Sequence, residues 1–413
     1  MITTHGIGAD GGAGDGGTAD ETADDGDTDE RELAARVIDT LLREDYGGLS
    51  NRVRLAADGP VLDLPAGDGG AALVLPLERD GFLADFRVRR TAAGSPRGAG
   101  SPLTLDDVDA ALAVVADPRD GAGVAAFAAE CRQALATLRL RGRYLPGAHR
   151  RLAGRRAGPD PLSGPRGLLT YEALAATLPH PAYPTGESRP GFGEEDALRY
   201  APEYAPEFEL RWVAVPRSLL VTAGRPDRPP GWPTAPDVGL PEAIAATHEL
   251  MPVHPLTARH ALGRALTEIG ALTGDGHRAL IAPGTGLLVT PTLSMRTVAL
   301  TGQPGEHLKL PLPTSTLGLL NRRFIPPGTL ADGALVRDVL ATAASQDAGL
   351  GRPLLGRLLL ADEGTYAHAG HSGLGYLVRR LPPGLGRCRI VPVAALLAPG
   401  PDAVTVDRWP HPG

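Results

Sequence analysis

The chain has 413 residues, of which 42% are hydrophobic and 4% aromatic, and its formal net charge is −7. This length suits two or three domains, and the absence of any run of eighteen uninterrupted apolar residues predicts no transmembrane helix. The first thirty residues hold nine acidic side chains and no Lys or Arg, so the rest is nearly neutral, which argues against nucleic acid as the main partner.

The N-terminal segment predicts an acidic tail followed by a helix. Residues 1–30 are rich in Gly, Asp and Thr and have almost no large apolar groups, so we expect them to be disordered. Apolar residues at helical spacing predict a helix over residues 30–44. Three short strands are expected next, around residues 52–55, 70–77 and 81–88.

A second helical block is predicted over residues 105–140. Thr104, with Asp107 three residues later, forms an approximate capping box at its start. The Arg-, Gly- and Pro-rich segment 147–167 predicts a connection between domains. We therefore expect a helical domain over residues 31–150.

Beyond Tyr171 the pattern changes to short strands, proline-rich turns and a few helices. Residues 208–215 alternate apolar and polar side chains, as a half-buried strand does, and residues 216–241 predict a proline-rich loop. The other expected elements are strands over 286–291, 295–300 and 307–312, a helix over 332–360, and a helix or strand over 373–380. The predicted class is α+β, with a mainly antiparallel-sheet domain over residues 165–400 and a C-terminal tail over 401–413.

The two cysteines, Cys131 and Cys388, are isolated from each other in the sequence. They fit a reducing compartment and exclude a cysteine zinc site. Because the N-terminus also lacks a basic-then-apolar signal pattern, we expect a cytoplasmic protein that is not bound to a membrane.

Lys309 is the only lysine in the chain, against forty arginines. Arginine is a rigid planar fork, whereas lysine is a compact point charge on a flexible stem. A lone lysine in such a composition indicates a position where one phosphate or carboxylate oxygen must be met, although a solvated surface position is the alternative.

Polar residues near Lys309 predict an anion site. On a strand, Ser294 and Arg296 would point to the same face, Lys309 on the next strand would join them, and Arg322 or Arg323 would add a second guanidinium. Such a set suits a nucleotide triphosphate, whose transfer chemistry depends on positioning and charge neutralisation. No P-loop motif is present, and edge-strand charges facing water are the alternative.

Two histidines, His180 and His254, each precede a proline, which restricts their backbone to extended conformations. This can fix a side chain in a cleft, but a structural histidine is the alternative. No third ligand at metal spacing accompanies them, so no zinc site is predicted, and no Gly-x-Ser-x-Gly elbow suggests a hydrolase.

Five segments resemble, in order, motifs of the NRPS-independent siderophore synthetases, the aerobactin-synthetase (IucA/IucC-type) family: residues 180–191, 204–208, 252–255, 294–297 and 309–323. The resemblance implies the thumb and fingers parts of such an enzyme, without the palm. It also implies ATP-dependent adenylation of a citrate-like or dicarboxylic acid, followed by capture by an amine, hydroxylamine or alcohol.

The resemblance also implies roles for individual residues. The expected ATP ligands are Ser294, Arg296, Thr297, Lys309, Thr314, Ser315, Thr316, and Arg322 or Arg323. The expected substrate-binding residues are His180, Arg189 and His254, and the expected catalytic residues are Lys309, Arg296 and His180.

The sequence also departs from the family pattern. Tyr183 replaces a histidine, Glu187 replaces a lysine and is expected to repel a polyanionic substrate, and Leu256 and Thr257 replace Trp and Gln. The family's second half, with a further histidine and the magnesium ligands, has no counterpart, so Mg²⁺ ligands and full activity are expected from a partner chain. A non-catalytic scaffold subunit and an inactive fragment are the alternatives, and a homodimer is possible.

Overall fold

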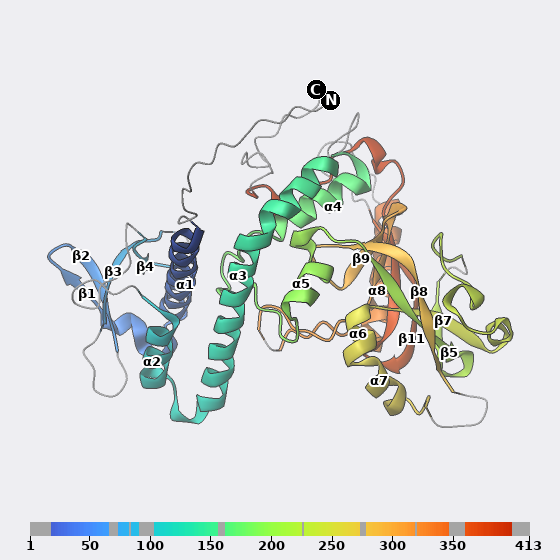
Figure 1. The fold of residues 1–413 in the computed structure, drawn as a ribbon, viewed down its shortest axis with the longest axis horizontal. Coiled ribbons are helices and arrows are strands. Elements are labelled where there is room, and N and C mark those ends of the chain that lie inside the picture. Colours follow the sequence, from blue (N-terminus) through green and yellow to red (C-terminus); the bar gives the residue numbers. More distant parts are fainter. Residues whose placement is uncertain are drawn as a thin grey trace, which may run out of the picture. The chain divides into compact units, whose positions relative to one another are not determined.

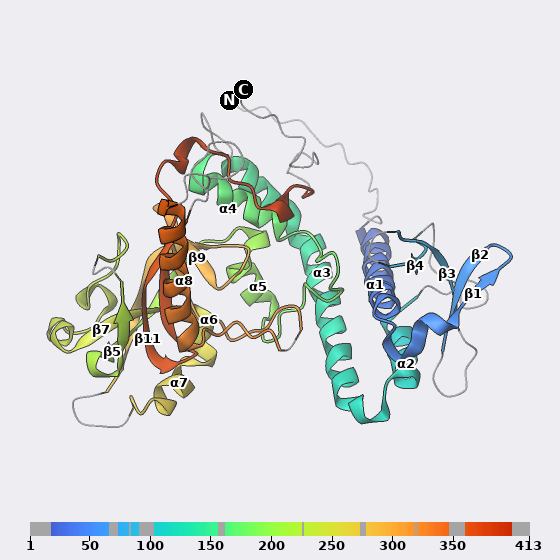
Figure 2. The same cartoon turned by 180° about the vertical axis from the view of Figure 1, so that it is seen from behind.

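The computed structural model describes residues 18–65, 73–81, 84–90, 103–155, 162–224, 227–272, 278–318, 320–346 and 360–398. The chain divides into two compact units, each described by itself (Figures 1 and 2). Unit 1 comprises Met1–Arg139 and Ala182–Thr185, and unit 2 comprises Leu140–Pro181 and Gly186–Gly413. The predicted tail over 401–413 lies outside the described residues.

Unit 1 combines helices with a four-stranded antiparallel sheet in the order β1-β2-β3-β4. The strands are β1 (Val53–Ala56), β2 (Gly59–Leu64), β3 (Leu73–Arg79) and β4 (Phe86–Val88). The helices are α1 (Thr18–Arg43), the 3₁₀ helices η1 (Tyr46–Arg52) and η2 (Pro118–Asp120), α2 (Leu105–Val115) and the first part of α3 (Gly121–Arg155). Leu33 and Val37, one turn apart on α1, pack in one core with alternate residues of β3.

Helix α1 begins earlier than predicted. It starts at Thr18, so the segment expected to be disordered is helical from residue 18 onward, while residues 1–17 lie outside the described part. The sequence there places acidic residues in the first turns, where the helix dipole favours negative charge. The prediction failed because it considered only the apolar groups available for burial.

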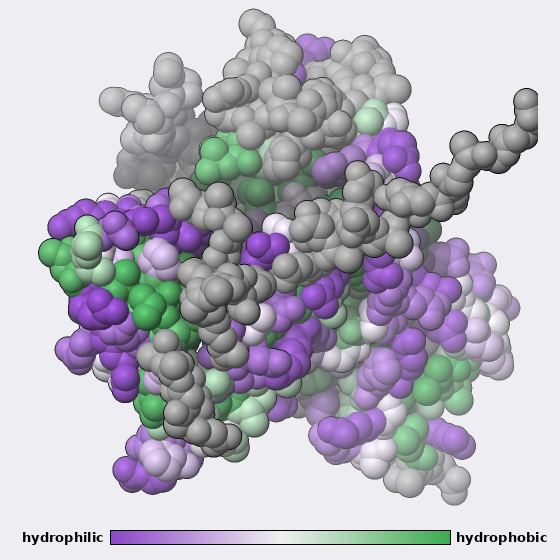
Figure 3. Space-filling view, turned by 60° about the vertical axis from the view of Figure 1, so that its left-hand side comes forward, coloured by the Kyte–Doolittle hydropathy of each residue, from purple (hydrophilic) through white to green (hydrophobic). Residues whose placement is uncertain are grey.

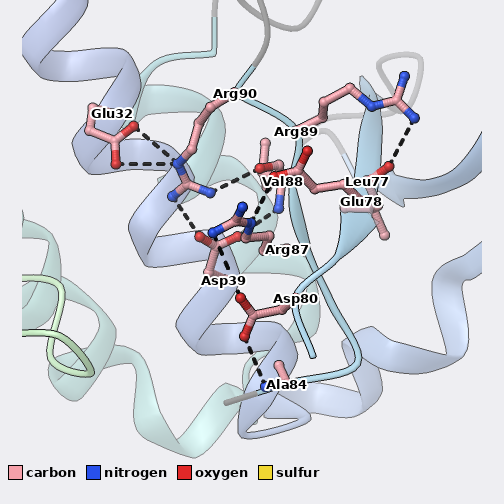
Figure 4. Close-up of polar contacts among 10 residues, drawn as sticks. All are labelled: Glu32, Asp39, Leu77, Glu78, Asp80, Ala84, Arg87, Val88, Arg89 and Arg90. Atoms are coloured by element: carbon pink, nitrogen blue, oxygen red, sulfur yellow. Dashed lines mark hydrogen bonds and ion pairs between the residues drawn. The ribbon is translucent and has the colours of Figure 1, made fainter. Parts of the chain in front are cut away.

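An ion-pair network joins β4 to α1 (Figure 4). The Arg90 guanidinium lies 3.1 Å from Glu32 and 2.6 Å from Asp39. It also donates to the Val88 carbonyl at 2.9 Å, and the Val88 amide donates to Asp39 at 2.7 Å. Burial raises the pKa of Asp39, and the Arg90 charge opposes that rise. These contacts hold the last strand of the sheet against α1.

The predicted capping box at the start of α2 is present. The Thr104 hydroxyl accepts from the Asp107 amide at 3.3 Å, and the Asp107 carboxylate accepts from the Thr104 amide at 3.1 Å. We expect Thr104→Ala to lower the free energy of unfolding by about 1 kcal/mol in urea denaturation. Thr104→Ser keeps the hydroxyl and is the control, so equal losses in both variants would contradict the capping role.

Helix α3 belongs to both units, because the division falls between Arg139 and Leu140. It continues through Pro146 to Arg155, so the connection predicted over 147–167 is helical in its first part. Ala148 and Leu152, one turn apart, are fully buried, and this burial favours the helix over a loop.

Unit 2 is built on an eight-stranded antiparallel sheet in the order β6-β11-β12-β10-β9-β8-β5-β7. Its strands are β5 (Phe208–Pro216), β6 (Val221–Ala223), β7 (His248–Val253), β8 (Leu280–Pro291), β9 (Thr297–Leu300), β10 (Gln303–Lys309), β11 (Asp362–His371) and β12 (Leu374–Arg380). Its α-helices are α4 (Gly164–Ala175), α5 (Glu194–Tyr200), α6 (Pro255–His260), α7 (Leu262–Glu268) and α8 (Pro327–Gln346). The predicted α+β class with a mainly antiparallel sheet is confirmed.

Several unit 2 elements differ from the sequence prediction. The proline-rich segment 216–241 contains the short edge strand β6, and the unpredicted β11 pairs between β6 and β12. Helix α8 starts at Pro327, earlier than predicted, and is described as far as Gln346, while residues 347–359 of the predicted helix lie outside the described residues. The segment 373–380, left open between helix and strand, is strand β12.

The register of the central strands sorts their side chains onto two faces. Lys309 is opposite Thr297 of β9 and Leu377 of β12, and His307 is opposite Arg379 of β12. Opposite residues of an antiparallel pair share a face, so Lys309, His307 and Arg379 lie on one face of the sheet. The alternate residue Leu308 points to the other face, into a core shared with α7.

Hydrophilic residues, in purple, cover much of the face displayed in Figure 3, with green apolar residues in small groups between them. Among the described helices, none combines the length and apolar character that crossing a membrane requires.

Candidate anion-binding site

The predicted phosphate ligands Ser294 and Arg296 lie in the turn between β8 and β9, not on a strand. Within this turn Met295 has a positive φ of 62°, and the Arg296 amide donates to the Ser294 carbonyl at 2.7 Å. The strand predicted over 295–300 therefore starts two residues late, at Thr297. The same-face argument for Ser294 and Arg296 was wrong, since residue alternation applies only to extended chain.

Hydroxyl groups hold this turn in shape. The Thr292 hydroxyl donates to the Thr297 carbonyl at 2.8 Å, and the Ser294 hydroxyl accepts from the Thr297 amide at 3.2 Å. The Thr292 and Ser294 hydroxyl oxygens are 3.3 Å apart. Ser294 and Thr297 thus stabilise the turn that carries Arg296.

Arg296 reaches toward the segment that carries the two adjacent arginines. Its guanidinium donates to the Phe324 carbonyl at 3.0 Å. Burial lowers the pKa of Arg296, and the charge of Arg323 lowers it further. Arg323 is therefore the arginine that faces Arg296, which the sequence left open.

Arg322 faces elsewhere. It is exposed and lines a cavity of about 610 Å³ together with Thr314, Ser315, His260 and Arg264. The backbone pairing explains why the two arginines point to different sides. Ser315 and Arg322 form an antiparallel β-bridge, and the Arg323 amide donates to the Thr314 carbonyl at 2.9 Å. Neighbouring residues of such a segment point in opposite directions.

The three predicted nucleotide-site hydroxyls are largely enclosed. Thr314 and Ser315 are buried, and the Thr314 hydroxyl donates to the Pro190 carbonyl at 2.9 Å. The hydroxyl oxygen of Thr316 is buried and makes no hydrogen bond to any residue that the structure describes, so it is available to a ligand.

Lys309 stands at the end of β10, half-buried. Burial is the main cause that lowers its pKa, and the charges of Arg296, Arg379 and Arg323 lower it further, while Glu363 opposes them. Within the part of the chain that the structure describes, no hydrogen bond or ion pair engages the Lys309 ammonium. We call Arg296, Lys309, Arg323 and Arg379 the cationic cluster.

The cationic cluster has the electrostatics of an anion site. Half-buried positive charges that lie close together are unfavourable, and an incoming polyanion relieves both their repulsion and their lost hydration. Arg379 was missed from the sequence, because the segment 373–380 could not be assigned to helix or strand and its faces could not be placed.

Two further titratable groups border the cluster. Glu172 on α4 accepts a hydrogen bond from the Leu293 amide, burial raises its pKa to about 7, and Arg379 opposes that rise. His307 donates from Nε2 to the Pro304 carbonyl at 2.9 Å, and burial lowers its pKa to about 4, so it is neutral near pH 7. Glu172 was also missed, since a single carboxylate on a helix carries no sequence signal.

Arg189, predicted to bind substrate, is instead part of a buried ion-pair cluster. It donates to both carboxylate oxygens of Glu203, at 2.6 and 3.0 Å. Arg141 lies 3.4 Å from Glu203 and 3.8 Å from Glu187, and all four residues are buried. The predicted repulsion of substrate by Glu187 is therefore wrong, because that carboxylate is buried and faces Arg141.

His254, also predicted to bind substrate, is a structural residue. It is 1% exposed, its Nδ1 accepts from the Leu256 amide at 3.2 Å at the start of α6, and its ring packs edge-on against Tyr200 and Phe208. Burial lowers its pKa to about 3, so it stays uncharged. His180 is exposed in the loop after α4, and no role for it follows from its position.

The described residues do not fit a Mg²⁺ site. Over those ranges no group of three or more His, Cys, Asp or Glu side chains is arranged to hold a metal ion. The cationic cluster, in contrast, has the charge to bind a polyanion.

The sequence matches the model of the IucA / IucC family over residues 167–398, which is more than half of the chain and includes the whole cationic cluster. The chain belongs to the IucA/IucC family. A curated relative is the 2-[(L-alanin-3-ylcarbamoyl)methyl]-3-(2-aminoethylcarbamoyl)-2-hydroxypropanoate synthase of Staphylococcus aureus. The two sequences are 26% identical over an alignment of 200 residues, which covers 46% of this chain and 31% of that protein.

Solved IucA/IucC structures share the fold. Aerobactin synthetase IucC of Klebsiella pneumoniae has a TM-score of 0.63 and 23% identity, with 91% of this chain and 65% of that chain covered. The ATP-bound aerobactin synthetase IucA of the same species has a TM-score of 0.54 and 18% identity, with 90% and 65% covered. This chain therefore spans less than two thirds of each.

Proposed function

We propose that this chain forms the nucleotide-binding part of an ATP-dependent siderophore synthetase. The observation that carries the proposal is the Lys309 ammonium, half-buried beside Arg296, Arg323 and Arg379 with no ion pair of its own among the described residues. Family membership and the synthase name of the Staphylococcus aureus relative support the same class of reaction.

In the proposed reaction a carboxylate oxygen attacks the α-phosphorus of ATP. The bond between that phosphorus and the bridging oxygen breaks, and pyrophosphate leaves with the electron pair. An amine, hydroxylamine or alcohol then attacks the acyl carbon, AMP departs, and the nucleophile loses its proton. Lys309, Arg296 and Arg323 neutralise the phosphate charge that grows during the first step.

The proposal includes a partner for the parts that these residues do not supply. Mg²⁺ ligands are absent from the described ranges, so a chain resembling the second half of the longer relatives would bring them. The carboxylate is citrate-like or dicarboxylic in this proposal, and the family resemblance is its support.

A non-catalytic binding subunit is the second candidate. This candidate is favoured because the described residues include no cluster of side chains that could bind a metal ion, and nucleotidyl or phosphoryl transfer from ATP ordinarily needs Mg²⁺. Such a subunit would bind nucleotide or a carboxylate through the cationic cluster without turnover.

ATP–pyrophosphate exchange separates the two candidates. We expect exchange that depends on a citrate-like or dicarboxylic acid when this chain is mixed with a chain carrying the family's second half, and little exchange by either chain alone. Nucleotide binding without exchange in the mixture would favour the binding subunit. A failure to bind either ATP or the carboxylate in every mixture would contradict both.

A further inference from the structure

Glu363 is a carboxylate close to the otherwise cationic surroundings of Lys309. It stands on β11, next to β12, and its charge acts on Lys309 in the direction opposite to the three arginines. A carboxylate within reach of an unpaired ammonium would ordinarily form an ion pair with it. Lys309 makes no such ion pair in the described part of the chain.

Arg379 explains this, because it holds Glu363. The Arg379 Nε donates to Glu363 Oε1 in a charge-assisted hydrogen bond, and both side chains are about one-third exposed or less. Arg379 shares the sheet face of Lys309, one strand away, as the pairing of Lys309 with Leu377 and of His307 with Arg379 shows. It therefore lies where it can compete with Lys309 for the same carboxylate.

The energetic consequence concerns what an incoming anion must displace. An ammonium already paired with a carboxylate must lose that pair before it can contact a phosphate, which cancels much of the gain. An unpaired ammonium has no such loss. The ion pair of Arg379 with Glu363 thus keeps one charge of the cationic cluster ready for a ligand.

We propose that Arg379 is a positioning residue that occupies Glu363 and thereby keeps the Lys309 ammonium available to an incoming anion. The proposal deepens the proposed function and rests on it for the identity of the anion. The charged and titratable groups around Lys309 are Arg296 in the turn, Arg323, Arg379, Glu363, neutral His307 on β10, and Glu172 on α4 beside Arg379.

Lys309 can be tested directly because it is the only lysine of the chain. Amine acetylation followed by peptide mass spectrometry reports its free-base fraction as a function of pH, with no nucleotide present. Arg379→Gln removes a nearby cation and releases Glu363, so both effects raise the pKa of Lys309. We expect its acetylation rate near pH 8 to fall by about threefold or more.

Glu363→Gln is expected to change the acetylation rate of Lys309 in the opposite direction. It removes the carboxylate that favours the charged form, so the pKa of Lys309 falls and acetylation becomes faster. Arg380→Gln is the matched control, because Arg380 adjoins Arg379 but alternates to the other face and pairs with Glu306 at 3.1 Å. It should leave the acetylation profile unchanged.

The affinity for inorganic pyrophosphate is a second test. Calorimetry should show weaker binding by Arg379→Gln, about tenfold, and binding by Glu363→Gln at least as tight as that of the unsubstituted chain. An Arg379→Gln variant whose Lys309 is acetylated as before would overturn the proposal. If circular dichroism shows that Arg379→Gln does not fold, the acetylation rate of Lys309 in Glu363→Gln becomes the deciding measurement. A rate that is not faster than in the unsubstituted chain would then overturn the proposal.

The outcomes remain separable from those of the proposed function. A mixture that never exchanges pyrophosphate contradicts the synthetase assignment, whereas the acetylation profiles alone decide the role of Arg379. Altered profiles without exchange would support Arg379 as the residue that frees Lys309 for an anion that is bound without turnover.

Discussion

Replacing Lys309 by alanine is expected to lower ATP–pyrophosphate exchange by about 10²–10³-fold in the mixture of this chain with its proposed partner. The ammonium is the compact charge among three guanidinium groups, and no other lysine in the chain can replace it. Charge-stabilising donors in enclosed sites typically have effects of this size on the transition state. Initial rates of exchange with saturating carboxylate measure the loss.

Lys309→Arg is the matched variant for this test. It keeps the positive charge but replaces the flexible point charge with a planar fork, so we expect a partial loss. Equal activity of Lys309→Arg and the unsubstituted chain would show that only charge matters. Unchanged exchange in Lys309→Ala would contradict the assignment of the cationic cluster to ATP.

Removing the Lys309 charge is not expected to destabilise the folded chain. Its pKa is lowered below the ordinary value of 10.5, so folding disfavours the ammonium. This penalty applies below the lowered pKa and disappears as pH rises from there to 10.5. Over that window the unsubstituted chain should gain stability relative to Lys309→Ala, which urea midpoints at several pH values measure.

The second large effect is expected at the buried ion-pair cluster of Arg141, Arg189, Glu187 and Glu203. Glu203→Gln leaves the Arg189 guanidinium buried without its bidentate partner, and we expect the free energy of unfolding to fall by about 3–5 kcal/mol in urea denaturation. The effect depends on pH. Burial opposes ionisation, but Arg189 and Arg141 hold the pKa of Glu203 below its usual 4.5. Its stabilisation is thus present above pH 4.5 and is lost as pH falls through the lowered value.

Glu195→Gln is the control for the buried pair. Glu195 and Arg199 form an exposed pair on α5 at 2.9 Å, with side chains 71% and 63% exposed. Exposed pairs contribute little because water and salt screen them. A loss at Glu203→Gln no larger than at Glu195→Gln would contradict the structural role of the buried cluster.

The order of motifs along the chain predicted which cationic residues lie near one another better than the local patterns did. The structure brings Arg296, Lys309 and Arg323 together, and those residues were chosen because a polyanion needs cations from neighbouring segments. The choice between Arg322 and Arg323 needed the pairing of Ser315 with Arg322, which no local pattern contains.

Residues that were misassigned or missed depend on long-range pairing. Arg189 and His254 sit in motifs typical of a binding cleft, yet their partners, Glu203 and the rings of Tyr200 and Phe208, bury them. Arg379 becomes part of the site only through the register of β10 with β12. Such register reflects packing of whole sheet faces, and a single sequence does not reveal it.

The hydrogen bonds of the turn before β9 leave the hydroxyl proton of Ser294 available to an acceptor. The Thr292 hydroxyl donates its only proton to the Thr297 carbonyl, and the Ser294 hydroxyl oxygen accepts from the Thr297 amide. Ser294 can still donate its own proton, which in this structure points toward the Thr292 oxygen. The turn therefore places a hydroxyl donor next to Arg296, and a phosphoryl or carboxyl oxygen can accept the Ser294 proton in place of the Thr292 oxygen.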